Sequence, residues 1–222
     1  MSEEEGNIEL ANWQSGKAGT IYLIPSPLSS AAWEDSLPGR IREVCNELSY
    51  FFAENLRTSR RFLSKLKLDR PIDQLRFEEV SKKTSFEEIL ELLQPVLSGT
   101  DAGMLSEAGC PGVADPGADL VQAAHQLGIK VVPLVGPSSF LLALMASGLN
   151  GQAFTFHGYL PLDKVERQRK IRELDKEARQ KECTQLFMET PYRNQKLFEE
   201  LLKTCQQDTQ LCIARDLTGE RE

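Results

Sequence analysis

The sequence predicts an α/β protein with a mostly parallel sheet, because short β-rich apolar runs alternate with helical stretches along its 222 residues. Hydrophobic residues make up 41% of the chain and charged residues 27%, an ordinary composition for a folded protein. This length suits one large domain or two small ones. We expect a polar lead-in over 1–18, an N-terminal lobe over 19–147, a linker region over 148–162 and a C-terminal lobe over 163–222.

The expected strands are short apolar runs bounded by turn residues. The first stops at Pro25, because proline cannot continue a central ladder. The N-terminal lobe is expected to hold strands over 20–24, 50–53, 102–105 and 129–134. Later strands are expected over 153–157, 184–188 and 210–214.

The expected helices show apolar residues at helical spacing and residues that favour helix ends. Ser85 is expected as an N-cap, with Glu88 in the capping-box position. Asp115 and Pro116 are expected as the N-cap and first residue of another helix, which Gly128 ends. The expected helices cover 41–48, 60–68, 85–97, 115–128, 163–182 and 193–206, and one more is opened by residues 136–139 and stops at Gly148.

Composition excludes several kinds of protein. Two histidines outside any HExxH pattern argue against a zinc hydrolase, and we expect no metal. The chain has no P-loop, no GxSxG and no GxGxxG after a strand. Five cysteines without CxxC spacing fit thiols in a reducing cytoplasm. No apolar run approaches the about 20 residues of a membrane span, and the acidic N-terminus does not resemble a signal peptide.

Three loops rich in Gly, Pro and Ser follow expected strands, over 25–30, 106–117 and 135–139. In an open α/β sheet, ligands bind outside the carboxyl ends of the strands, where such loops gather. Gly109 and Gly136 let the backbone approach a ligand, and we expect Gly136→Val to block a pocket without unfolding the protein. Ordinary helix-capping turns are the alternative, but three such loops in one short chain favour a pocket.

The segment LSEAGCPGVADPG, residues 105–117, resembles the signature loop of the tetrapyrrole-methylase-like methyltransferases. The similarity runs from about residue 19 to the end. It is strongest to the branch that methylates the ribose 2′-hydroxyl of a cytidine in 16S ribosomal RNA. Further motifs similar to that branch occur in order at 22–27, 53–58, 132–138, 156–161, 187–193 and 214–218.

This resemblance implies a two-lobed fold with S-adenosylmethionine in the cleft between the lobes, and a homodimer. A sulfonium already carries an activated methyl group, so no protein nucleophile is needed. The expected cofactor-binding residues are Pro27, Ser106, Ala108, Gly109, Cys110, Pro111, Val113, Ala114, Gly136, Pro137, Ser138, Ser139, Met188 and Ala214.

The sequence indicates the residues that would bind or deprotonate the methyl acceptor less clearly than the cofactor-binding residues. Glu54 is a candidate base, with a structural carboxylate paired to Arg57 as the alternative. A basic run on the helix over 163–182 is a candidate RNA contact, although it also fits a solvated helix face. The expected substrate-binding residues are Arg57, Lys164, Arg167, Arg169 and Arg172. The net charge of −7 argues against RNA held by bulk charge alone, so a local patch is required.

The chain departs from the family pattern at several points. Asn55 stands where the family usually has Asp, and Cys110 stands where a small hydroxylated residue is common. The sequence ends at Glu222, whereas the family continues through a final strand or two, so we expect a truncated C-terminal lobe or an unusually short member of the family. The leading hypothesis is an RNA methyltransferase. A methyltransferase acting on a tetrapyrrole or another small molecule, and a non-catalytic cofactor-binding module, are the alternatives.

Overall fold

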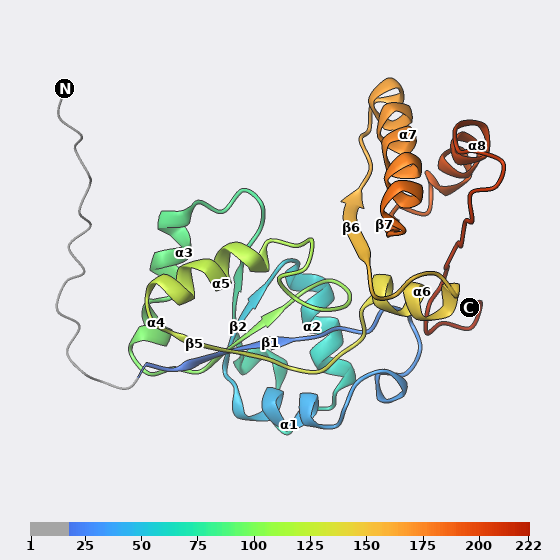
Figure 1. Cartoon of the computed structure of the whole chain (residues 1–222). Coiled ribbons are helices and arrows are strands. Elements are labelled where there is room, and N and C mark those ends of the chain that lie inside the picture. Colours follow the sequence, from blue (N-terminus) through green and yellow to red (C-terminus); the bar gives the residue numbers. More distant parts are fainter. Residues whose placement is uncertain (1–17) are drawn as a thin grey trace, which may run out of the picture. The chain divides into compact units, whose positions relative to one another are not determined.

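The computed structural model describes residues 18–222 (Figure 1). Most of the lead-in expected over 1–18 therefore lies outside the described residues. The described chain forms two compact units. The first contains the residues up to Ile24, Gly39–Glu107 and Pro111–Leu134, and the second contains Pro25–Pro38, Ala108–Cys110 and Val135–Glu222. No helix in the described part is long and apolar enough to cross a membrane.

The first unit is built on a five-stranded parallel sheet of order β3-β2-β4-β1-β5. In β1 the register pairs Ile24 with Leu105 of β4, and Leu23 with Pro133 of β5. The parallel α/β architecture expected from the alternating pattern is confirmed. The strands are β1 Thr20–Ile24, β2 Tyr50–Ala53, β3 Arg76–Glu79, β4 Ala102–Leu105 and β5 Lys130–Pro133.

Helices cover this sheet with apolar faces. In α5, Leu120, Ala123 and Ala124 are buried against the core that contains Phe52 and Met104. The expected capping box is present at the start of α3, where Ser85 Oγ accepts a hydrogen bond from the Glu88 backbone N–H at 3.2 Å. The α-helices are α1 Arg40–Glu47, α2 Leu56–Lys65, α3 Phe86–Leu92, α4 Gln94–Leu97 and α5 Gly117–Gln126, and a 3-10 turn covers Ile72–Gln74.

Several boundaries in the first unit differ from the expectation, and three of the differences concern helices whose ends or caps are informative. Helix α2 begins four residues before the expected start, because the Asn55 side chain caps it by accepting from the Arg57 and Thr58 backbone N–H groups at 3.0 and 3.2 Å. The helix expected over 85–97 is two helices that meet at Leu93. Helix α5 starts one residue late, with Pro116 at the N-cap.

The second unit contains a two-stranded parallel sheet, β6 Phe154–Tyr159 beside β7 Thr184–Met188. Its helices are α6 Ser139–Ser147, α7 Lys164–Lys181 and α8 Asn194–Thr204, and a 3-10 turn covers Trp33–Asp35. Leu160, Ile171, Leu174, Leu197 and Leu201 form its core. Strand β6 falls within the range 148–162 that was expected to include a linker.

The strand expected over 210–214 is wrong. These residues have no regular structure, and their apolar side chains Leu211 and Ile213 are exposed. A β-rich sequence forms a strand only when a neighbouring strand supplies its hydrogen bonds. Residues 210–214 pair with neither β6 nor β7.

Candidate functional site

The chain connections of the central strands β1 and β4 of the first unit indicate a binding site. They are neighbours in the sheet, but the chain runs from β1 to β2 on one side and from β4 to β5 on the other. This reversal is a topological switch point, where open α/β sheets bind ligands at the carboxyl ends of their strands. Two of the expected loops begin at these ends, at Pro25 and Ser106.

Parts of the three loops meet within the second unit. Ser26 and Gly109 form an isolated antiparallel bridge, with N–H to O distances of 2.9 and 3.0 Å. The thiol of Cys110 donates to the Pro137 carbonyl oxygen at 3.4 Å. A Cβ on Gly136 would lie 2.1 Å from Pro25 Cβ. The loops after β1, β4 and β5 are therefore held together by direct contacts.

Ser138 is the unexplained polar group of this loop cluster. It occupies the N-cap position of α6, yet its side chain makes no capping bond. Its Oγ is buried and has no hydrogen-bond partner within residues 18–222. A buried hydroxyl without a partner is costly, and natural structures keep few of them. A ligand atom at this loop would supply the missing bond.

The rest of the signature loop, over 111–117, belongs to the first unit. Asp115 Oδ1 accepts from the backbone N–H groups of Gly112 and Gly117 at 2.7 and 2.9 Å. Gly112 has φ +83°, and Ala114 has φ +61°, which is uncommon for a residue with a Cβ. Burial raises the pKa of Asp115. The two hydrogen bonds to Asp115 hold the loop in a strained conformation that exposes Val113 and Ala114.

Glu54 follows β2 and is half-buried. Its Oε2 accepts from the Glu107 backbone N–H at 3.4 Å. Burial raises the pKa of Glu54, and the nearby charges of Asp115 and Glu107 raise it further. The alternative pairing with Arg57 is not among the ion pairs of the described residues. A carboxylate with a raised pKa is a better proton acceptor near neutral pH.

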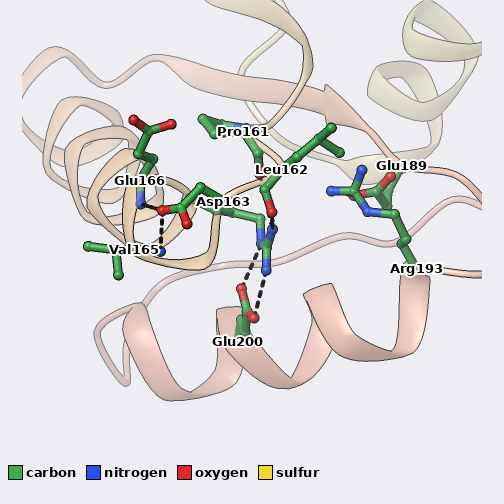
Figure 2. Close-up of polar contacts among 9 residues, drawn as sticks. Pro161, Leu162, Asp163, Val165, Glu166, Glu189, Arg193 and Glu200 are labelled. Atoms are coloured by element: carbon green, nitrogen blue, oxygen red, sulfur yellow. Dashed lines mark hydrogen bonds and ion pairs between the residues drawn. The ribbon is translucent and has the colours of Figure 1, made fainter.

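The structure separates the members of the basic run on α7. Arg167 is buried, and its guanidinium forms an ion pair with Glu200 of α8, while its Nη1 donates to the backbone carbonyls of Pro161 and Leu162 (Figure 2). These contacts argue against its expected role as a phosphate contact, because every nitrogen of the guanidinium already has a partner. Lys164, Arg169 and Arg172 are exposed.

The remaining predicted residues lie apart from these contacts. Met188 ends β7 and is half-buried, and Ala214 is exposed in the irregular segment 210–214. A cavity of about 470 Å³ lies in the second unit and is lined by residues of α7, β7 and α8. None of the predicted site residues lines it. Sequence reasoning also missed Glu200, because no local pattern links it to Arg167.

The parallel sheet with flanking helices defines an α/β protein. The family profile of the tetrapyrrole (corrin/porphyrin) methylases matches residues 34–222, and the chain belongs to this family. The resemblance expected from residues 105–117 is thus confirmed.

Named relatives are similar over most of the chain. Ribosomal RNA small subunit methyltransferase I of Streptococcus pyogenes serotype M6 is 35% identical over 201 residues, covering 90% of this chain and 66% of that protein. The Bacillus subtilis protein of the same name is 29% identical over 204 residues, covering 92% and 65%. The chain thus spans slightly less than two thirds of the length of these relatives.

A solved structure supports the fold. The native form of uroporphyrin III C-methyl transferase from Thermus thermophilus superposes with a TM-score of 0.50 at 17% identity. The alignment covers 84% of this chain and 77% of that one. At this identity the likeness concerns the fold alone.

Proposed function

We propose that this protein is an S-adenosylmethionine-dependent methyltransferase that methylates a ribose 2′-hydroxyl of small-subunit ribosomal RNA. The observation that carries the proposal is membership of a methylase family together with relatives named ribosomal RNA small subunit methyltransferase I. The motifs over 105–117 and 132–138 support the ribose-methylating branch.

The loop cluster fits the proposed cofactor. Ser138 offers a buried hydroxyl that lacks a partner in the described chain, and Gly109 has a positive φ of 74° beside the Ser26 bridge. Backbone groups and one small hydroxyl are suited to reading a polar nucleoside without long side chains. When bound, S-adenosylmethionine supplies a methyl group activated by its sulfonium. Pro27, Ala108, Cys110 and Ser138 of these loops are among the residues proposed to hold it.

The chain's own residues would then position the acceptor and take up its proton. Holding two reacting groups close and in line lowers the barrier by several kcal/mol. Glu54 is the proposed base for the 2′-hydroxyl, because burial raises its pKa while Glu107 orients its carboxylate. Asn55 does not share this role, since its side chain caps α2.

The RNA would be held by the exposed members of the basic run. Lys164, Arg169 and Arg172 lie on α7, and Arg57 is exposed on α2. Contacts with phosphates release counterions, so binding should weaken steeply as salt rises.

The proposal includes a homodimer in the cytoplasm. Helix α6 is apolar on all sides, yet Leu144 is its one buried residue and Met145 is 79% exposed. An apolar helix of this kind is normally covered. A second copy is the proposed cover. The described free cysteines fit a reducing compartment.

The decisive experiment is methyl transfer from labelled S-adenosylmethionine to small ribosomal subunits from a strain that lacks the methylation. We expect label in 16S RNA at one ribose, detected as a nucleotide bond that resists alkaline hydrolysis. The Glu54→Gln protein serves as the slow control. Label in a tetrapyrrole but not in RNA would establish the small-molecule alternative, and absence of any transfer despite cofactor binding would establish the non-catalytic one.

A further inference from the structure

The second unit contains another cavity, of about 180 Å³, where α7 and α8 begin. It is lined by Leu162, Arg167, Glu189, Arg193, Lys196 and Leu197. Both arginines of this group form ion pairs, Arg167 with Glu200 and Arg193 with Glu189; Figure 2 shows Arg193 beside Glu189. Three of the six lining residues are cations, which is unusual in a chain of net charge −7.

The carboxylates at this cavity are already occupied. Glu200 accepts two hydrogen bonds from Arg167, at 2.7 and 2.9 Å. Glu189 Oε2 lies 2.8 Å from Arg193 Nη2, and its Oε1 accepts from the Thr190 backbone N–H at 2.7 Å. Lys196 has no ion pair with any residue from 18 to 222. The uncompensated charge at the cavity is therefore positive.

The start of α8 adds to this positive charge. The helix has 11 residues, its N-cap residue Arg193 makes no side-chain capping bond, and its first turn contains no acidic residue. A lysine in the first turn is unfavourable beside the positive end of the helix dipole, whereas an anion there is favourable. Lys196 and the positive end of the helix dipole thus favour the same kind of ligand.

An exposed aromatic residue is the sequence neighbour of Arg193, which lines the cavity. Tyr192 immediately precedes Arg193 and is 84% exposed. Proteins that bind single-stranded nucleic acid combine cationic grooves for the backbone with aromatic side chains on which bases stack. An exposed tyrosine one residue from a cationic cavity matches this mode better than it matches a free inorganic anion, which needs no aromatic surface.

We propose that this cavity is a subsite for a phosphodiester of single-stranded RNA, with Tyr192 as the stacking surface for a neighbouring base. This inference rests on the proposed function and extends the RNA-binding surface from α7 to the start of α8. Lys196 contacts the phosphate, while the Arg167 and Arg193 ion pairs hold the cavity walls.

The test measures binding of a fluorescein-labelled single-stranded RNA by anisotropy at several salt concentrations. Lys196→Gln should weaken binding about three- to ten-fold and reduce the slope of log K against log salt by about 0.7. Lys203→Gln, on the last turn of the same helix, is the matched control and should bind as the parent does. Tyr192→Ala should weaken binding about five-fold or more, and Tyr192→Phe should retain it.

Other results would overturn the subsite. Equal losses of RNA affinity in Lys196→Gln and Lys203→Gln would show that overall charge, and not this cavity, attracts the RNA. Unchanged RNA affinity in Lys196→Gln would show that Lys196 does not contact the phosphate. Thermal shifts with inorganic phosphate form a separate arm. If phosphate stabilises the parent but not Lys196→Gln while RNA binding is the same in both, the site takes free phosphate and the RNA proposal fails.

A methyl-transfer assay distinguishes failure of the subsite from failure of the proposed function. If ribosomal RNA is methylated but Lys196→Gln binds RNA normally, the subsite alone fails. If RNA binding depends on Lys196 but the parent transfers no methyl group, the proposed function alone fails. Cofactor affinity, measured by calorimetry, should be the same in the parent and in Lys196→Gln.

Discussion

Arg167 and Glu200 form a two-pronged ion pair between α7 and α8, with Nε and Nη2 of the arginine donating to the two carboxylate oxygens at 2.7 and 2.9 Å. The side chains are only 5% and 8% exposed. The hydrogen bond from Arg167 lowers the pKa of Glu200. The ion pair with Glu200, rather than a contact with phosphate, therefore explains the arginine at position 167.

Removing Arg167 should therefore destabilise the protein. Arg167→Ala leaves a buried carboxylate without its partner, which typically costs about 3–5 kcal/mol. Urea unfolding followed by circular dichroism measures the loss. Lys170→Ala, which breaks the more exposed pair with Glu173, should cost under about 1 kcal/mol. Equal losses in the two variants would contradict the structural role of Arg167.

Reversing the exposed charges on α7 should weaken RNA binding without unfolding. The double variant Arg169→Glu, Arg172→Glu leaves the Arg167 pair intact and should lose RNA affinity by ten-fold or more, with a lower salt dependence. Cofactor affinity should stay the same. The control variant Lys130→Glu, Lys203→Glu makes the same change in net charge elsewhere. Equal RNA binding by both double variants would remove this patch from the substrate site.

Gly136→Ala should disturb the loop cluster itself. The added Cβ would lie 2.1 Å from Pro25 Cβ, so the loops after β1 and β5 must separate. This close approach argues against the expectation that a side chain at Gly136 would block a pocket without unfolding the protein. We expect both a lower melting temperature and weaker cofactor binding. Gly39→Ala, whose Cβ meets nothing within 4 Å, is the control and should change neither.

Ser138→Ala should separate binding from stability. No hydrogen bond within the described chain is lost, so the free energy of unfolding should be unchanged or slightly higher. Cofactor affinity should fall by about three- to ten-fold if Oγ bonds the ligand. Ser147→Ala is the converse control, since Ser147 Oγ donates to the Leu144 carbonyl at 2.8 Å. Unchanged calorimetric affinity in Ser138→Ala would exclude this hydroxyl from the site.

Glu54→Gln should change the pH dependence of both stability and activity. Because the folded pKa of Glu54 is raised, its protonated form favours folding at low pH, and this contribution is lost as pH rises through the folded pKa. The variant should thus be at least as stable as the parent at pH 7, with no advantage in acid. Its methyl-transfer rate should fall. A rate equal to that of the parent across the pH range would exclude Glu54 as the base.

The sequence alone determined the elements whose causes are local. The apolar runs of β1 and β4 and the Ser85–Glu88 capping box appear as expected, because burial and capping depend on neighbouring residues. Strand β3 was missed since its residues, Arg76–Glu79, are mostly charged. Its place at the edge of the sheet requires no apolar run.

Tertiary structure decided the features that join distant residues. Arg167 looks like a member of a basic surface run until Glu200, 33 residues later, is seen to neutralise it. Residues 210–214 have the composition of a strand but lack a partner strand. Gly136 was recognised as a loop glycine, but only its approach to Pro25 shows why a side chain is not tolerated. Ion pairs, ladders and close contacts depend on distances that the order of residues does not contain.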